Sequence, residues 1–175
     1  MDIRTLQRPL KDRYRQDATT AQITLRADGS QTDTPLSCSV DLGRAIYQAE
    51  AHQGVGGAGG AACSGDLLLG ALAACAQLTC QLVATNMGIQ ATSIRVTVEG
   101  DMDLRGTLGL AKDVPVGFSA IRTTFAIDAP GATAEQLEVL KEKTEQYCVV
   151  LQTLRQPPPL TGTWTTGDGG DLAVG

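Results

Sequence analysis

The sequence predicts an α+β fold, a single domain in which two helices pack against largely antiparallel strands. Strand-like segments occur before and after a long apolar segment, and a second helical pattern follows the later strands. Strands and helices that are segregated along the chain in this way are typical of α+β proteins. The length of 175 residues suits one domain, so residues 1–175 are expected to form a single unit.

Composition and charge narrow the class of protein. Apolar residues make up 42% of the chain but aromatic residues only 3%, which predicts a core of aliphatic and small side chains. The formal net charge of −5 disfavours nucleic acid as a partner, because phosphate backbones are bound by clustered Lys and Arg. The charged start "DIRTLQRPLKDRYRQ" lacks the apolar segment of a secretory signal, which predicts a cytoplasmic location. Thiols are kept reduced there, so the five cysteines do not predict a disulfide framework.

The first third of the chain predicts two strands and a loop. Residues 21–29, "AQITLRADG", have the composition of a strand that ends at a turn. Residues 36–43, "LSCSVDLG", alternate apolar and polar side chains, which places Cys38 on the apolar face of a second strand. Residues 53–60, "QGVGGAGG", are too rich in glycine for regular structure and are expected to form a mobile loop.

A long helix is predicted over residues 65–87. Ser64 is a suitable N-cap, Asp66 places a negative charge in the first turn, and Gly88 suits the position after the last turn. The helix is apolar on nearly all sides, and residues 67–84 carry no formal charge. Its glutamines, threonine and thiols disfavour a membrane span. Such a helix must be covered on every side, and a second subunit would supply the missing cover, so we expect a homodimer.

The second half predicts two strands, a helix and a short strand. Residues 92–104 and 117–129 alternate as strands do. Residues 134–147 form an amphipathic helix that begins with a capping box of Thr133 and Gln136. Its apolar stripe contains Leu137, Leu140, Thr144, Tyr147 and Leu151. The prolines of "QPPPL" end this region, residues 161–166 predict a last short strand, and the tail after it is expected to be loose.

The cysteines differ in what their positions allow. Cys38 is expected to pack in the core, and Cys63, just before the long helix, is either a reactive thiol or a loop residue without a role. Cys75 and Cys80 project about 140° apart on one helix and therefore cannot share one site within one chain. Both are expected to be packed, as judged from the helix alone. Cys148, at the end of the second helix, is expected near the surface, where packing and reactivity both remain open.

The number and spacing of the histidine and cysteine residues disfavour a metal site and a hydrolase site. His52 is the sole histidine and the chain has no C-x-x-C pair, so a zinc site would need unrelated ligands to converge. No Ser or Asp stands at a recognisable spacing from His52, so a catalytic triad has no support.

Two motifs resemble signatures of the OsmC/Ohr family. "GDLLLGALAACAQLT" is similar to the central-helix signature, and "EKTEQYCVVLQTL" to the second motif, which usually reads Cys-Pro-Val where this chain has Cys-Val-Val. The glycine pair upstream and the "TVEGDMD" segment between the motifs agree with this likeness, which extends over residues 20–165. The resemblance implies an intertwined α+β homodimer with an active site at each subunit interface.

The resemblance also implies a function and its residues. It implies a thiol peroxidase that reduces organic hydroperoxides, with Cys75 as the peroxidatic thiol, Cys148 as the resolving thiol and an external dithiol as reductant. It implies no cofactor, because neither metal nor flavin is needed. An arginine held by an acidic residue would keep the thiolate ionised. Asp66 occupies the position of that acid, and Arg15 and Arg44 are both candidates for the arginine.

Two other functions remain open. The first is a non-catalytic dimer that binds a small apolar ligand at the subunit interface. The second is thiol transfer or disulfide exchange through Cys63 or Cys80.

Overall fold

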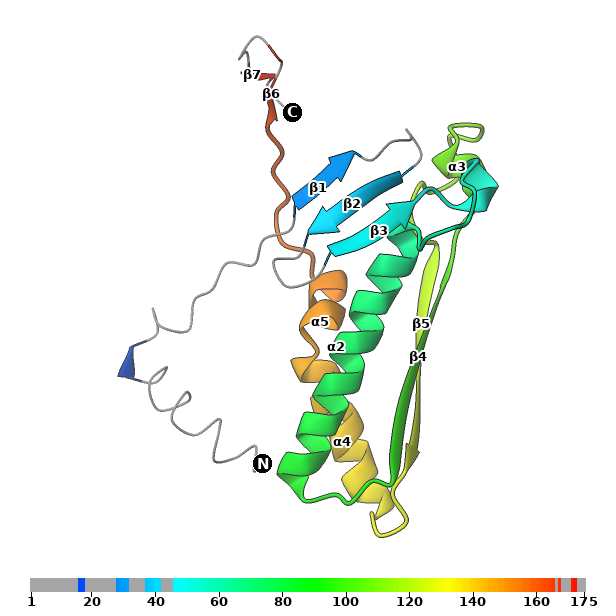
Figure 1. Cartoon of the computed structure of the whole chain (residues 1–175). Helices are drawn as coiled ribbons and strands as arrows, with labels where there is room; N and C mark the ends of the chain where they lie inside the picture. The colour runs from blue at the N-terminus through cyan, green and yellow to red at the C-terminus, as the bar shows by residue number, and fades with distance from the viewer. Residues whose placement is uncertain are drawn as a thin grey trace.

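The computed structural model describes residues 16–17, 28–31, 37–41, 46–165, 167 and 171–172. A long helix, α2 (Ser64–Met87), occupies the middle of the molecule and is flanked by a pair of long strands and by two further helices (Figure 1). Strands β4 (Ser93–Asp101) and β5 (Ala120–Asp128) pair antiparallel over their whole length. This arrangement confirms the predicted α+β class.

The N-terminal strands form a small sheet in the order β1-β2-β3 near the start of α2 (Figure 1). Its strands are β1 (Asp28–Gln31), β2 (Ser37–Asp41) and β3 (Ile46–Glu50), all antiparallel. The predicted strand over 36–43 corresponds to β2, whereas residues 21–27 of the other predicted strand lie outside the described residues. Strand β3 was not predicted, because Ile46 and Tyr47 are consecutive apolar residues that are both exposed and therefore show no alternation.

The expectation that residues 53–60 hold no regular structure is wrong, whereas their predicted mobility stays a prediction. A short 3-10 helix, η2 (Gln53–Val55), opens this glycine-rich segment, and the carboxylate of Glu50 fixes the rest. One Glu50 oxygen accepts the N–H of Ala58 at 2.8 Å, and the other accepts the N–H groups of Gly60 and Ala61 at 2.7 and 3.3 Å. Glycine is required at Gly57, because a Cβ there would lie 1.6 Å from the Ala51 carbonyl oxygen. The segment is therefore an ordered support for the start of α2.

Helix α2 begins one residue earlier than predicted, and its N-cap is Cys63 rather than Ser64. The Cys63 N–H donates to the Asp66 carboxylate at 2.9 Å, which satisfies one of the free donors at the helix start. Gly88 takes the left-handed conformation after the last turn, as predicted, with φ of 75°.

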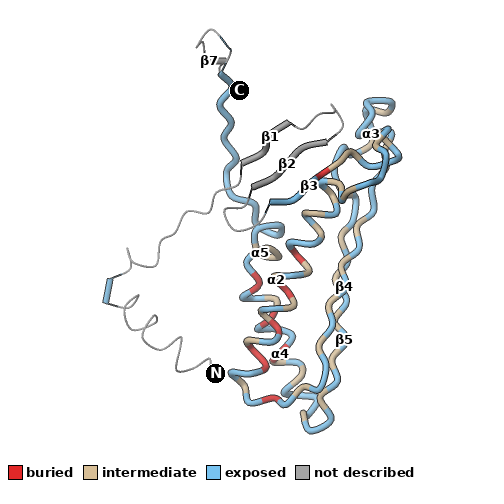
Figure 2. Tube along the Cα trace, viewed as in Figure 1, coloured by how far each residue is buried: buried red, intermediate tan, exposed pale blue. Residues whose placement is uncertain are grey.

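Burial on α2 is confined to one face (Figure 2). Leu68, at the edge of this face, is 40% exposed, and Leu78, on the opposite side, is 61% exposed, so the described residues do not cover the helix on every side. By length and composition α2 could cross a membrane, a test that core helices of soluble proteins also pass. Here α2 packs against β4, α4 and α5. Its buried residues are Leu72, Ala76, Cys80, Val83 and Ala84.

Helix α4 (Ala134–Tyr147) confirms the predicted capping box, in which the Gln136 N–H donates to the Thr133 hydroxyl at 3.2 Å and the Thr133 N–H donates to the Gln136 side chain at 2.9 Å. The predicted stripe is partly wrong, because Tyr147 is 60% exposed. The buried face instead advances in steps of four residues, through Leu140 and Thr144 to Cys148.

The prediction that Cys148 lies near the surface is also wrong, because Cys148 is completely buried. It ends α4 and at the same time begins α5 (Val149–Arg155), with extended backbone angles between the two helices. The bend at Cys148 turns its side chain toward α2, and the charged residues that precede it face solvent.

The remaining elements lie at the periphery. The strand predicted over 92–104 ends at Asp101, because Asp103 caps a short helix, α3 (Leu104–Thr107), by accepting the Arg105 N–H at 3.0 Å. The strand predicted over 117–129 is β5. The predicted last strand corresponds to β6 (Trp164–Thr165), which pairs with β7 (Asp171–Leu172).

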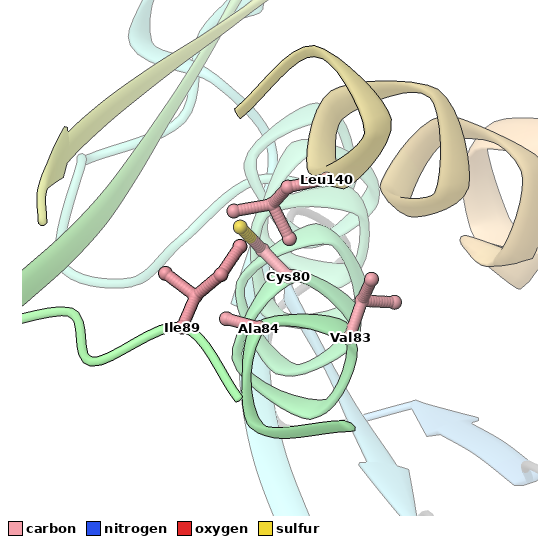
Figure 3. Close-up of a cluster of buried hydrophobic side chains, with 5 residues drawn as sticks. All are labelled: Cys80, Val83, Ala84, Ile89 and Leu140. Carbon is pink, nitrogen blue, oxygen red and sulfur yellow. The ribbon is translucent and has the colours of Figure 1, made fainter. Parts of the chain in front are cut away.

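Two buried clusters follow each other along α2. The Cys80 cluster, toward the end of the helix, places the Cys80 sulfur against Leu140 and Ile89 (Figure 3). The Cys148 cluster, nearer the middle, consists of Leu72, Ala76 and Cys148, with Cys75 and Leu151 packed against it. The members of the Cys80 cluster are Cys80, Val83, Ala84, Ile89 and Leu140.

Candidate active site

The structure brings Cys75 and Cys148 together. Cys75 lies in the middle of α2, and the bend between α4 and α5 presents Cys148 to it. Cys75 packs against the buried cluster that contains Cys148, and the Cys148 thiol is one of the groups that lower the pKa of Cys75. Cys148 is completely buried, whereas Cys75 is half-buried and can be reached from solvent. The two cysteines whose pairing the family resemblance implied are therefore neighbours, although the helix geometry alone could not pair them.

The surroundings of Cys75 favour its thiolate. Burial raises the pKa of Cys75, but hydrogen bonds to the sulfur outweigh this effect and bring the pKa below its ordinary value. The groups that lower the pKa of Cys75 are, from the largest effect to the smallest, the Val150 N–H, the Cys148 thiol, the Thr79 hydroxyl and the Val149 N–H. An ionised sulfur is the nucleophilic form of cysteine.

The pKa of Cys148 is shifted in the opposite direction. Burial raises the pKa of Cys148, and the neighbouring Cys75 sulfur raises it further, against a lowering by the N–H of Leu151. The two shifts therefore favour the thiolate at the accessible Cys75 and the protonated thiol at the buried Cys148.

The other cysteines lie elsewhere. Cys80 belongs to the Cys80 cluster, where burial raises its pKa. This confirms that Cys75 and Cys80 face different surroundings and that Cys80 is a packed residue. Cys38 lies in β2, and its side chain falls outside the described part of the chain. Cys63 is free and partly exposed at the start of α2.

Asp66 lies in a second pocket, separate from the thiol pair. It is nine residues ahead of Cys75, or about 13 Å along the helix at 1.5 Å per residue. The Cys63 N–H lowers the pKa of Asp66, and the Cys63 thiol and the His52 side chain act in the same direction. A cavity of about 460 Å³ contains these three side chains together with the apolar walls of Leu69 and Phe118.

The arginine expected beside Asp66 remains a prediction, because Arg15 and Arg44 both lie outside the described residues. For the described residues, no group of three His, Cys, Asp or Glu side chains could hold a metal ion.

A larger groove, of about 840 Å³, lies between β5 and the helices α4 and α5. Leu72 and Leu151 are part of its wall, and these residues also belong to or pack against the Cys148 cluster. Its lining combines apolar side chains with polar and charged ones, and the buried Thr144 hydroxyl has no hydrogen-bond partner among the described residues. The polar and charged residues of the lining are Ser119, Thr123, Glu138, Lys141, Thr144, Glu145 and Arg155. Neither Cys75 nor Cys148 is part of the lining, so the groove lies beside the thiol pair.

The sequence interpretation missed three groups that act on Cys75. Thr79 could have been found from its spacing, since residues four apart lie on one face of a helix. The N–H groups of Val149 and Val150 could not, because their direction depends on the bend at Cys148. In the second motif a proline after the cysteine would lack the N–H that Val149 supplies here.

The structure defines an α+β protein in which Cys75 of the central helix packs beside Cys148 of the bend between α4 and α5, and comparison with known proteins identifies the family. The family model described as "OsmC-like protein" matches residues 57–162, which is more than half of the chain. The protein belongs to the OsmC-like family. No curated protein is similar enough to count as a match.

Solved structures share the fold at low sequence identity. An OsmC-like protein from Mycoplasma pneumoniae is 16% identical with a TM-score of 0.65, over 78% of this chain and 90% of that one. An organic hydroperoxide resistance protein from Elizabethkingia anophelis is 22% identical with a TM-score of 0.58, over 78% and 91%. The organic hydroperoxide resistance protein OsmC from Legionella pneumophila is 18% identical with a TM-score of 0.55, over 77% and 90%. At these identities the likeness establishes the fold.

Proposed function

We propose that the protein is a thiol peroxidase that reduces organic hydroperoxides to alcohols, with Cys75 as the peroxidatic thiol and Cys148 as the resolving thiol. The observation that carries this proposal is the packing of Cys75 against the buried cluster of Cys148, together with the opposite directions in which their pKa values are shifted. Structural neighbours that bear the name of organic hydroperoxide resistance proteins support the same substrate class.

The reaction balances without a cofactor. The Cys75 thiolate attacks the distal oxygen of ROOH, the O–O bond breaks, and the alkoxide takes a proton from water and leaves as the alcohol. Cys75 is then a sulfenic acid. The Cys148 sulfur attacks the Cys75 sulfur, the S–O bond breaks, and water leaves as a Cys75–Cys148 disulfide forms. An external dithiol reduces this disulfide by two thiol–disulfide exchanges, and its own thiols become a disulfide.

Further parts of the proposal lie beyond the thiol pair. Asp66 is proposed to hold an arginine that supports the thiolate, and that arginine would be Arg15 or Arg44 of this chain or its copy. A homodimer is proposed because the described residues leave Leu68 and Leu78 exposed on the central helix. The proposed setting is the cytoplasm, where a dithiol reductant is at hand, without a membrane or nucleic acid as partner.

The test measures consumption of cumene hydroperoxide with dithiothreitol as the reductant, together with intact mass after peroxide treatment. Cys75→Ser is expected to abolish turnover, because the proposed reaction begins with attack by the Cys75 sulfur. Cys148→Ser is expected to add the mass of one oxygen atom at Cys75, since the sulfenic acid then has no resolving partner. Cys63→Ser is the matched control and should behave as wild type. A wild-type protein that does not consume the peroxide would refute the proposal.

A second candidate function is favoured by the groove of about 840 Å³ beside the cluster, whose lining includes the apolar side chains of Phe125, Leu137 and Leu154. In this alternative the protein is a non-catalytic dimer that binds a small apolar ligand at the subunit interface. It predicts that Cys75 reacts with iodoacetamide no faster than a free cysteine does. Rapid alkylation at neutral pH would exclude this alternative.

A further inference from the structure

The groove between β5 and the helices α4 and α5 contains a threonine hydroxyl that lacks a partner. Thr144 lines the groove and is only 2% exposed, and its hydroxyl makes no hydrogen bond within the described part of the chain. Thr85 shows the usual alternative for a threonine inside a helix, since its hydroxyl donates to the carbonyl of Gln81 at 2.8 Å. Burying a hydroxyl without a partner is unfavourable, so a partner from outside the described chain is expected for Thr144.

A water molecule is a poor candidate for that partner. The buried residues of the groove besides Thr144 are Leu72, Cys80 and Leu140, as far as the chain is described. Two of these are aliphatic, and the thiol of Cys80 is only a weak hydrogen-bonding group. A buried water usually makes about three hydrogen bonds, which the buried part of the groove does not offer. A molecule with one polar group and an apolar body suits these surroundings better.

The groove has room for such a body. Phe125 and Ile127 of β5 and Leu137 of α4 line it, and all three are half-buried and pack against the Cys80 cluster. Its volume of about 840 Å³ lies in the range of about 300–1,000 Å³ that is typical of sites for small molecules. Such sites combine apolar walls with a few polar groups that orient the ligand.

The charged residues of the groove favour an uncharged ligand. They are two carboxylates and two cations that pair with each other, Lys141 with Glu138 at 2.8 Å and Arg155 with Glu145 at 2.8 Å. These side chains are between 35% and 62% exposed, so both ion pairs face solvent. Neither sign of charge is in excess, and a charged ligand would have to break an ion pair to find a partner.

We propose that this groove is a binding site for a small uncharged alcohol, whose hydroxyl pairs with that of Thr144 and whose carbon chain lies against Phe125 and Ile127. An alcohol is favoured over a carbonyl compound, because a hydroxyl can both donate to and accept from the unpaired threonine, whereas a carbonyl only accepts. The inference goes beyond the proposed function and does not rest on it, since the described lining contains neither Cys75 nor Cys148.

The test measures binding of 1-octanol and of n-octane to the full-length protein, from the loss of each compound from the headspace above the solution. The ratio of the two affinities isolates the hydroxyl, because both compounds have the same carbon chain. Thr144→Val keeps the branched shape and removes the hydroxyl, so it should lower the ratio of octanol to octane affinity by about three- to tenfold. Thr144→Ser should retain most of the wild-type ratio. Thr85→Val is the matched control, because it removes a hydroxyl from outside the groove.

Two further arms test the location of the site and the charge of its ligand. Leu154 lines the groove and is 38% exposed, so Leu154→Trp should narrow the groove and weaken octanol and octane alike. Octanoate and octylammonium share the chain but carry a charge, and each should bind at least about tenfold more weakly than octanol. Equal binding of either charged compound would contradict the proposed ligand class.

Four other results would overturn the inference: no octanol binding by wild type, an unchanged ratio in Thr144→Val, an equal change in Thr85→Val, or octanol binding only after a dimer has dissociated. The last result would mean that a second copy of the chain covers the groove. Peroxide consumption is measured in parallel on the same samples. Octanol binding without peroxide turnover would refute the proposed function alone, and turnover without octanol binding would refute this inference alone.

Discussion

Cys75 and Cys80 lie little more than one turn apart on the same helix, yet their surroundings drive them in opposite chemical directions. Cys75 meets hydrogen-bond donors from α5 and Thr79, and its pKa is lowered despite burial. Cys80 meets Leu140 and Ile89, and burial raises its pKa (Figure 3). The contrast shows that the neighbouring donors, rather than position on an apolar helix, decide whether a thiol is reactive.

The largest expected difference between the two thiols is in labelling of the native protein. At neutral pH iodoacetamide should modify Cys75 at least about 10³-fold faster than Cys80, because Cys80 must wait for local opening of its cluster. Peptide mass after timed quenching gives both rates from one sample. Comparable rates for the two thiols would show that the distinction between their surroundings does not hold in solution.

Packing in the Cys80 cluster can be weakened by a substitution that leaves Cys75 and Cys148 unchanged. Leu140 is completely buried against Cys80, so Leu140→Ala should lower the free energy of unfolding by about 2–5 kcal/mol. Urea denaturation measures this loss. The alkylation rate of Cys75 in the folded variant should stay unchanged, and a parallel change would mean that the two clusters are coupled.

On the Cys75 side, Val149→Pro removes one donor from the first turn of α5. Proline is tolerated at the first position of a helix, and the extended backbone of Cys148 suits a residue before proline. With one N–H lost, the pKa of Cys75 should rise and its alkylation at pH 7 should slow by about threefold.

The control for this change is Val149→Ala, which keeps the N–H and removes a side chain that is 70% exposed. It should leave the pH profile of alkylation as in wild type. A profile in Val149→Pro that matches Val149→Ala would contradict the assignment of this N–H as a donor.

The smallest effect is expected in the glycine-rich segment before α2, away from both thiols. The N–H of Ala58, followed by that of Gly60, lowers the pKa of Glu50 below its ordinary value of 4.5. The folded-state pKa is the lower one, so the contribution of Glu50 is complete above pH 4.5 and is lost as pH falls through the folded value. Hydrogen exchange at Ala58, Gly60 and Ala61 should accelerate relative to intrinsic rates in that acidic range.

Glu50→Gln should remove this pH dependence and leave the loop less protected at neutral pH as well. The labelling of Cys75 should be unaffected, since Glu50 acts on the glycine segment before α2. Equal protection in Glu50→Gln and wild type would argue against the carboxylate as the element that orders the segment.

Sequence patterns predicted the elements whose side chains repeat regularly. The two long strands and the helices α2 and α4 were found because their apolar residues recur at strand or helix spacing, and Thr133 and Gln136 form a local capping box. The ordered glycine segment was missed, because its acceptor is Glu50 on a separate strand. No local pattern shows that contact.

The candidate site was only partly predictable for the same reason. Resemblance supplied Cys75 and Cys148, but the charged residues before Cys148 suggested a surface position. Its burial results from the change of backbone direction between two helices, and this also aims the N–H groups of Val149 and Val150. Pairing the thiols required the tertiary packing of α5 on α2, which neither motif contains.

Gln77, which stands between the two thiols on α2, has a consequence for how the molecule meets its neighbours. Its side-chain amide donates to the Ile94 carbonyl at 2.8 Å and accepts the Val96 N–H at 3.0 Å. A glutamine amide carries the same donor and acceptor as a peptide group, so Gln77 takes the place of a further strand beside β4. The Ile94 carbonyl and the Val96 N–H are therefore not free to pair with a strand of another chain. In this way Gln77, a polar residue in an apolar helix, protects this part of the sheet edge from edge-to-edge aggregation.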